Sequence, residues 1–365
     1  MFDRVDKPLL ITIGILLLSG LIIFGSAALG VLAVNEVKFY AVIKTQLIYA
    51  LIGGSFALCL GAMIPYRLYA KYAYYLFGLA AAFTSLVFVP GLQRYHGGAH
   101  RWIDIGPFSL QPSEALKFAF VVAVAAWCTH YRHLFKDLKY GLLPYFVAAG
   151  LVSVILLAQP DFGTYLVIMT SSFVTYFVGG ARKKHIYTLI ISGVLGVMLL
   201  ISLRPYMLER VKTFLDSGHD PRGSSWQLNQ SLIALGGGGL TGRGLGQSVQ
   251  KFNYLPEPIG DSIFAVLGEE LGFLGVIFLL TLYGIVGVRG YSISKYAGDQ
   301  FGRLLAIGIV TIILAQATLN IGSMLGVLPL SGVPLPLVSH GGTALMVALF
   351  ELGVLLNISK SSTIV

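Results

Sequence analysis

Long apolar runs separated by short polar segments dominate the chain. Residues 8 to 35, between Lys7 and Glu36, contain no charged residue. A helix needs about 20 apolar residues to cross a bilayer, whereas the apolar core of a signal peptide has roughly 7–15. This first run therefore predicts an uncleaved transmembrane helix.

The same pattern recurs along the chain and predicts an all-α, polytopic membrane protein, with one integral membrane domain over residues 1–365. About ten spans are expected, at 8–34, 41–63, 71–90, 113–130, 141–159, 162–180, 184–204, 261–288, 303–325 and 340–358. Between the seventh and eighth spans, the polar stretch of about 204–260 predicts a large external loop. Every short loop on one side carries Lys or Arg, so this side is predicted to be cytoplasmic, with both termini on it.

The composition agrees with a membrane protein. Hydrophobic residues make up 56% of the chain and charged residues 11%, against roughly 25% charged in soluble domains. The net charge of +9 could suit nucleic acid, but the basic residues are scattered among the spans. We therefore expect no nucleic-acid partner. Cys59 and Cys128 lie in apolar runs without a CxxC pattern, so neither a disulfide framework nor a metal site is predicted.

Basic residues gather in two external segments, 91–117 and 204–260. Long loops escape the rule that positive charge stays inside, so the second cluster is compatible with the topology. Ordinary solvation of the loops is one interpretation, and an outward-facing anionic ligand is the other.

The first external segment leads into the fourth span through PSEALK. Pro112 suits a helix start, Glu114 suits its first turn, and Lys117 shares the face of Glu114. An ionisable residue inside a span is a functional candidate; a structural Glu114–Lys117 pair is the alternative. Arg101 and Trp102, just before this helix, are candidates for binding a phosphate at the membrane interface.

The external turn AQPDFGTY, residues 158–165, places Asp161 where it can cap the sixth span. Further on, the run 236–246 contains seven glycines, among them Gly237 and Gly238. Glycine allows close approach of the backbone, so this run could cradle a phosphate together with Arg243, although no Walker lysine pattern is present. Gln227 and Gln230 are spaced to share one helical face.

The stretch YLPEPIGDSIFAVLGEE, residues 254–270, holds four acidic residues in an otherwise apolar environment. Asp261 begins an apolar helix and is either an N-cap or a functional carboxylate at the external boundary. Glu269 and Glu270 lie inside the span and must find partners within the protein, so we expect them to tie helices together.

The last external loop, NIGSMLGVLPLSGVPLPLVSHGGTALM, is interrupted by three prolines. Broken backbone at membrane depth occurs where it lines a cavity or is buried in protein. Ser339 and His340 are polar groups at such a break. His340 is either a substrate contact that titrates near neutrality or a hydrogen-bonded structural residue.

Several blocks together resemble one known family. They read GAHRWIDIGPFSLQPSEALK, QPDFGT, WQLNQSLIALGGGGLTGRGLGQSVQKFNYLPEPIGDSIFAVLGEELGFLG and LPLSGVPLPLVSHGGTALM. They are similar to the signature blocks of the SEDS (shape, elongation, division and sporulation) proteins, which include FtsW and RodA, and they follow the family's order over nearly the whole chain. QKFNYLPEPIGDSIFAVLGEELGF and LPLVSHGG look more like FtsW than RodA.

The resemblance implies a peptidoglycan glycosyltransferase of the bacterial cytoplasmic membrane that polymerises lipid II at the outer face, for septal synthesis in cell division. It implies a catalytic aspartate at Asp261 and a functional lysine at Lys117. The chain departs from the family where Ile259 and Gly260 replace a histidine–threonine pair and where His340 replaces a tyrosine. A class B penicillin-binding protein and other division proteins are the implied partners, besides membrane lipid.

The chemistry accounts for a single carboxylate. A diphosphate leaves as a stabilised anion, so one base and nearby cations should suffice where a glycosidase commonly needs two carboxylates. Asp261 is the expected base, no cofactor is evident, and a divalent cation stays open. The expected substrate-binding residues are Arg101, Trp102, Lys117, Arg210, Gln227, Gln230, Gly237, Gly238, Arg243, Ser339 and His340. The expected structural residues are Glu114, Asp161, Glu269 and Glu270.

Three alternatives remain: a lipid II flippase, a RodA-type elongation polymerase and a structural scaffold. A flippase predicts a polar path across the membrane through Glu269, Glu270 and Glu351. A polymerase predicts that Arg101, Lys117 and Arg210 converge with Asp261 in an external cavity that opens sideways to lipid.

Overall fold

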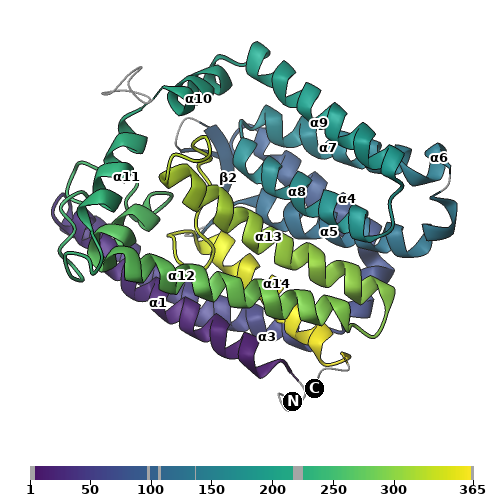
Figure 1. Ribbon diagram of the computed structural model, residues 1–365, viewed down its shortest axis with the longest axis horizontal. Coiled ribbons are helices and arrows are strands. Elements are labelled where there is room, and N and C mark those ends of the chain that lie inside the picture. The colour runs from purple at the N-terminus through teal and green to yellow at the C-terminus, as the bar shows by residue number, and fades with distance from the viewer. Residues whose placement is uncertain (1–4, 97–98, 106–107, 136, 217–224, 363–365) are drawn as a thin grey trace.

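Helices form nearly all of the computed structural model, which describes residues 5–96, 99–105, 108–135, 137–216 and 225–362 (Figure 1). The helices are α1 (Lys7–Leu32), α2 (Glu36–Leu47), η1 (Ile48–Gly54), α3 (Ser55–Met63), α4 (Tyr66–Ser85), η2 (Leu86–Phe88), α5 (Pro112–His130), η3 (Arg132–Leu134), α6 (Leu138–Gly141), α7 (Leu143–Ala158), α8 (Phe162–Val178), α9 (Lys183–Leu203), α10 (Pro205–Leu215), α11 (Trp226–Gly237), α12 (Ile263–Lys295), α13 (Gln300–Met324) and α14 (Gly342–Ser359).

Eight helical segments of the described chain are long and apolar enough to cross a membrane. They are α1, α2 with η1 and α3, α5, α6 with α7, α9, α12, α13 and α14. The apolar helix α8 is shorter, with 17 residues, and α4 is not among the eight. The multi-pass helical architecture is therefore confirmed, while the count of ten spans and the cytoplasmic side stay predictions.

Local sequence explains where several helices begin. Asp6 accepts a hydrogen bond from the Leu9 N–H at 2.9 Å at the start of α1, and Asp299 accepts one from the Gly302 N–H at 2.8 Å at the start of α13. Such caps satisfy backbone donors that the first helical turn leaves free. The predicted span 41–63 is part of a longer helix because its amino end, from Glu36, is polar but still helical.

Residues near the two ends of the chain meet. The Asp6 N–H donates to Ser359 Oγ at 3.1 Å, and Arg289 Nε donates to Asp6 Oδ2 at 3.0 Å. The labelled N and C ends lie at one end of the molecule in Figure 1. Both ends therefore lie on the same side of the helical bundle.

The all-α prediction missed a small antiparallel sheet between α4 and α5. Its strands are β1 (Gln93–His96), β2 (Ala99–Ile105) and β3 (Phe108–Leu110), in the order β1-β2-β3. Ile103 of β2 pairs with Gln93 and with Leu110, and it is buried. Strands this short give only a few alternating positions, which is a weak pattern beside the long helical runs.

The predicted external loop 204–260 also contains structure. α10 and α11 lie within it, and Figure 1 shows α10 joined to the peripheral helix α9, apart from the central helices. α10 buries Met207 and exposes Lys212. This segregation of apolar and polar faces stabilises a helix at a surface, so a polar stretch does not have to be irregular.

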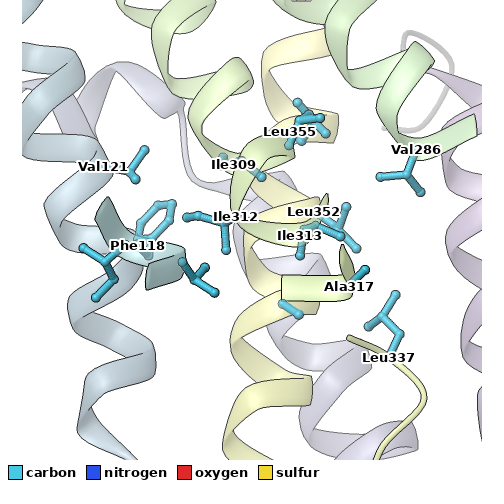
Figure 2. Packing of buried hydrophobic residues seen from close by; sticks show 14 of the residues in the cluster. Phe118, Val121, Val286, Ile309, Ile312, Ile313, Ala317, Leu337, Leu352 and Leu355 are labelled. Atoms are coloured by element: carbon cyan, nitrogen blue, oxygen red, sulfur yellow. The ribbon is translucent and has the colours of Figure 1, made fainter. Parts of the chain in front are cut away.

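The core is built where α5, α13 and α14 pack together. Figure 2 shows Phe118 and Val121 of α5 facing Ile309 and Ile312 of α13, with further apolar side chains of α14 behind them. Because this core is dry and apolar, polar groups within it require partners inside the protein.

Candidate active site

Asp261 lies in the turn before α12 and is partly exposed. α12 begins at Ile263, and its N-cap residue is Ser262, with no side-chain capping bond. The interpretation of Asp261 as a helix cap is therefore wrong, since the chain makes an additional turn before the helix starts. Its carboxylate makes no ion pair within 4.0 Å among the residues that the structure describes.

Two arginines are cationic neighbours of this carboxylate. Arg210 of α10 and Arg101 of β2 both act on it electrostatically. A methyl group built on Gly332 would lie 3.6 Å from Arg210 Nη2 and 3.6 Å from Asp261 Oδ2. Arg210 and Asp261 thus lie beside the same glycine, and Arg101 is close enough to act on the carboxylate electrostatically.

Burial and neighbouring charges shift the pKa values of Asp261 and Arg210. Burial raises the pKa of Asp261, and the nearby Glu257 carboxylate raises it further, while Arg210 and Arg101 oppose this shift. Burial lowers the pKa of Arg210, whose charge is partly supported by Asp261. A carboxylate whose pKa is raised toward neutrality is a better general base than an ordinary aspartate.

Arg101 is held by the turn between α7 and α8. Its Nε donates to the Gln159 carbonyl at 3.3 Å, and its Nη1 lies 3.9 Å from Asp161 Oδ1. Asp161 also accepts a hydrogen bond from the Thr164 N–H at 3.4 Å. The predicted cap of the sixth span is thus observed, and the same carboxylate helps to orient Arg101. Trp102 lies next to it on β2 and is half-buried.

A polar face of α13 holds the extended segment 329–336 beside Asp261. Gln316 Nε2 donates to the Pro334 carbonyl at 3.0 Å. Asn320 Nδ2 donates to both the Asp261 and the Val333 carbonyls at 2.8 Å, and Ser323 Oγ donates to the Pro329 carbonyl at 2.9 Å. Sequence reasoning missed this role, although the spacing of these α13 residues, four and three apart, marks one helical face.

Arg210 binds the same segment, because its Nη1 donates to the Leu330 carbonyl. α10 and α13 therefore hold the 329–336 segment from two sides. Asn320 joins this segment to the backbone of Asp261, and Arg210 binds the segment directly.

Ser339 and His340 bind the backbone just before Asp261. Ser339 Oγ donates to the Gly260 carbonyl at 2.7 Å, and the His340 N–H donates to the Ile259 carbonyl at 2.7 Å. His340 Nδ1 lies 3.0 Å from Oε1 of the buried Gln46. Burial lowers the pKa of His340, which favours a neutral ring. These contacts favour the structural interpretation of His340, and both residues fix the turn that carries Asp261; the substrate role predicted for Ser339 stays a prediction.

Lys117 is buried, with 2% of its surface exposed. Its Nζ donates to Glu114 Oε2 and to Gln316 Oε1, both at 2.7 Å. Lys117 thus reaches the 329–336 segment through Gln316, and the structure shows no direct contact with the carboxylate of Asp261. The two arginines therefore act on Asp261 directly and this lysine only indirectly, while the predicted cavity that opens to lipid stays a prediction.

Of the two glutamines on α11, Gln227 binds the residue that follows Asp261. Its Nε2 donates to Ser262 Oγ at 3.0 Å, directly beside Asp261 in the chain. Gln230 is almost completely buried on the same helix. The substrate roles predicted for both residues stay predictions.

The glycine-rich run packs against a break in α12. Gly272 has φ 63° and interrupts this helix, which frees backbone groups on both sides. The Glu269 and Glu270 carbonyls accept from the Arg243 and Gly244 N–H groups at 3.0 Å. In return, the Phe273 and Leu274 N–H groups donate to the Gly239 and Leu240 carbonyls at 2.9 and 3.1 Å.

This contact explains why glycine occupies position 238. A methyl group there would lie 2.0 Å from the Gly268 carbonyl oxygen. At Gly237 it would lie 3.1 Å from Nη2 of Arg243. These two glycines thus approach protein groups and let the run pack against α12, while the predicted phosphate cradle stays a prediction.

Glu269 and Glu270 bind the loop that follows the glycines. Glu269 accepts from Ser248 Oγ at 2.6 Å and lies 3.4 Å from Arg243 Nε. Glu270 accepts from Lys251 Nζ at 2.6 Å and from Ser26 Oγ of α1 at 2.5 Å. The predicted structural role is observed, but their partners are mainly in this loop rather than in other spans.

Two further observations concern only the described part of the chain. No hydrogen bond there links Glu269 or Glu270 to Glu351, whose carboxylate oxygens have no hydrogen-bond partner. These three residues are therefore not joined to one another by hydrogen bonds in this part of the chain, and the flippase stays an alternative. No group of three or more His, Cys, Asp or Glu side chains in the same residues could hold a metal ion.

The comparisons with known proteins agree with this architecture. The family model of the cell cycle proteins FtsW, RodA and SpoVE matches residues 7–364. Stage V sporulation protein E of Bacillus subtilis is 38% identical over 97% of this chain and 95% of its own length. A protein of Trichlorobacter lovleyi with the name probable peptidoglycan glycosyltransferase FtsW is 37% identical over 97% and 93%.

Solved structures extend the likeness to the fold. A chain of a peptidoglycan synthase complex has a TM-score of 0.80 and 30% identity, covering 98% of both chains. The rod shape determining protein RodA of Thermus thermophilus has a TM-score of 0.71 and 26% identity, covering 99% of both. With its apolar helices and near-complete coverage by these relatives, the chain belongs to the FtsW/RodA/SpoVE family of multi-pass proteins of the bacterial inner membrane.

Proposed function

We propose that this chain is a peptidoglycan glycosyltransferase that polymerises lipid II at the outer face of the cytoplasmic membrane. The observation that carries this proposal is the partly exposed Asp261 carboxylate with Arg101 and Arg210 as its cationic neighbours. Relatives with the name probable peptidoglycan glycosyltransferase FtsW support it, because they cover almost the whole chain at 35–37% identity.

The proposed reaction joins two lipid-linked disaccharides. The 4-hydroxyl group of the acceptor attacks the anomeric carbon of the donor, and the Asp261 carboxylate accepts the hydroxyl proton. A new glycosidic C–O bond forms, and the bond from the anomeric carbon to the diphosphate oxygen breaks, leaving its electron pair on that oxygen. The positive charges of Arg101 and Arg210 oppose the negative charge that develops there. The polyprenyl tail stays in lipid throughout.

Lys117, Ser339 and His340 act by positioning in this proposal. Each of them reaches the backbone around Asp261, either directly or through Gln316. Their contribution is to keep the base and the arginines in a fixed geometry before the substrate arrives, which lowers the cost of reorganisation during the reaction. At the departures from the family pattern, the Ile259 and Gly260 carbonyls accept the bonds that fix this turn, and the His340 ring contacts Gln46.

The proposed cellular role is septal synthesis during cell division. The blocks around Asp261 and His340 are similar to those of FtsW, and the relatives with that name support this assignment. A class B penicillin-binding protein is the proposed transpeptidase partner. The likeness to a chain from a structure on coordination of polymerization and crosslinking by a peptidoglycan synthase complex supports this partnership. Elongation of the side wall is the alternative role, as the likeness to RodA shows the same fold.

Polymerisation of purified lipid II by the purified full chain tests the activity. Asp261→Asn keeps the size of the side chain and removes the base, so we expect folded protein whose rate falls by ~10²–10⁴-fold. Near-normal strand synthesis by this variant rejects Asp261 as the base. Transport of lipid II across vesicles without any polymer, in the wild-type chain, favours the flippase instead. Adding a chelator to the same assay decides whether a divalent cation takes part.

A further inference from the structure

Glu351 is an unpaired carboxyl group in the middle of α14. Its side chain is 0% exposed, and neither of its oxygens has a hydrogen-bond partner in the part of the chain that the structure describes. An ionised carboxylate without a partner inside a membrane span is very unfavourable. The reaction at Asp261 does not use this group, so its presence requires another explanation.

The charged groups that act on Glu351 are Lys117 and Glu114, both on α5. Lys117 and Glu114 already form an ion pair at 2.7 Å, and both are 3% exposed in their side chains. This pair is electrically balanced. An ionised Glu351 would therefore add one uncompensated negative charge to a buried cluster.

The members of this cluster are themselves buried, since Glu114, Lys117, Gln316 and Glu351 are at most 3% exposed. Phe118, Ala317 and Leu352 directly follow Lys117, Gln316 and Glu351 in the chain. All three are buried, and Figure 2 shows them in the apolar packing between α5, α13 and α14. Such a core strongly disfavours net charge.

We propose that Glu351 is a proton-binding site that keeps its proton at neutral pH. With Glu351 neutral, the Lys117 ammonium group stays between Glu114 and Gln316, where both bonds are 2.7 Å long. Loss of the proton places a second carboxylate in competition for this ammonium group. The bond to Gln316 is then weakened, and with it the Gln316 bond to the Pro334 carbonyl.

The proton on Glu351 thus supports the segment that adjoins the active site. Gln316 and Asn320 on α13 hold neighbouring carbonyls of this segment, and Asn320 also holds the Asp261 carbonyl. Glu351 is accordingly a positioning residue, which acts through Lys117 and Gln316. Proton binding is independent of the proposed function, whereas the effect on the rate rests on it.

Infrared spectroscopy of the purified full chain tests proton binding directly. A protonated carboxyl group has a carbonyl-stretching band that an ionised carboxylate lacks. We expect one such band at neutral pH that is lost in Glu351→Gln. The matched control is Glu36→Gln, at the exposed start of α2, which should retain the band. Persistence of the band in Glu351→Gln, or loss of an ionised carboxylate band instead, overturns the proposal.

If Glu351→Gln does not fold, a second variant makes the same test. Glu351→Leu places an apolar side chain in the same space and should lose the same band. If the wild-type chain shows no protonated carboxyl band at neutral pH, the proposal is wrong whatever the variants do.

The pH profile tests the positioning role. As pH rises and Glu351 loses its proton, we expect the kcat of the wild-type chain to fall with little change in KM, while Glu351→Gln keeps its kcat. An identical alkaline loss in both proteins contradicts the positioning role. If neither protein polymerises lipid II, the proposed function fails, and the infrared result still decides on proton binding.

Discussion

The carboxylate just before α12 and the two carboxylates about two turns into this helix have different surroundings. Asp261 is partly exposed and has two arginine neighbours but no close ion pair in the described part of the chain. Glu269 and Glu270 are each 1% exposed and are bonded on both oxygens. The three residues are similar in chemistry and close in sequence.

The difference shows how structural and reactive carboxylates can be told apart. A carboxylate that is fully bonded within the protein stabilises the fold and has no free lone pair for a substrate proton. A carboxylate that is held by its backbone, with cations nearby but not bonded, remains available as a base. Asp261 has this second arrangement, because Asn320, Ser339 and His340 bind the backbone of its turn.

The largest stability effect is expected at Glu270. Glu270→Gln removes the charge that pairs with Lys251 Nζ at 2.6 Å, and Lys251 is 0% exposed in its side chain. Breaking one partner of a buried pair leaves an uncompensated charge and costs about 3–5 kcal/mol. We expect a lower melting temperature of the purified protein, partly restored by adding Lys251→Met. A melting temperature unchanged in Glu270→Gln contradicts the structural role.

Substitution of Arg210 is expected to have a smaller effect than that of Glu270, and the effect is on activity. Arg210→Gln removes a cation that lowers the pKa of Asp261, so this pKa rises further above its ordinary value. A base is active above its pKa, and its activity is lost as pH falls through that value; the acid limb of the kcat profile should therefore move to higher pH. We also expect a rate loss of ~10²-fold from the missing charge stabilisation.

Lys212 provides the matched control for Arg210. It lies on the same helix, is 45% exposed in its side chain and pairs with the exposed Glu209. Lys212→Gln should leave both the rate and the acid limb unchanged. Equal shifts in the two variants would mean that the net charge of α10, rather than the proximity of Arg210 to Asp261, sets the pH dependence.

Variants of Lys117 distinguish a purely structural ion pair with Glu114 from a positioning role in the reaction. Lys117→Met leaves Glu114 buried and unpaired, and we expect lower stability and lower polymerisation. The double variant Lys117→Met with Glu114→Gln removes the unpaired charge, so its melting temperature should recover. Its activity should stay low, since Gln316 still lacks its bond to Lys117. Full recovery of activity in the double variant would show that the pair is only structural.

The smallest effect is expected in the glycine-rich run. Gly238→Ala places a methyl group 2.0 Å from the Gly268 carbonyl oxygen, whereas a methyl group at Gly236 meets nothing within 4 Å. Forcing a group into a packed contact costs about 1–3 kcal/mol. Thermal denaturation should therefore show a loss for Gly238→Ala and none for Gly236→Ala. The reverse order would contradict the packing of this run against α12.

Much of the architecture follows from the sequence alone. Apolar runs long enough to cross a bilayer predict a multi-pass helical protein, because the requirement for internal backbone hydrogen bonds in lipid leaves helices as the simple solution. The cap at Asp161 is likewise local, since a side chain reaches a backbone N–H only three residues away. The family blocks around Asp261 and Lys117 are contiguous in sequence, so they also could be recognised there.

Only the tertiary structure decides which polar groups meet. Gln46 lies beside His340 although 294 positions separate them, and Gln316 lies beside Lys117 across 199 positions. The glycine-rich run supports a break in α12 that no pattern of apolar residues announces, since Gly272 is one glycine among 44 in the chain. Periodicity reports which face of a helix is buried, but it carries no information about the partner on that face. The roles of Arg243, Asn320 and Glu351 are therefore set by packing between distant segments.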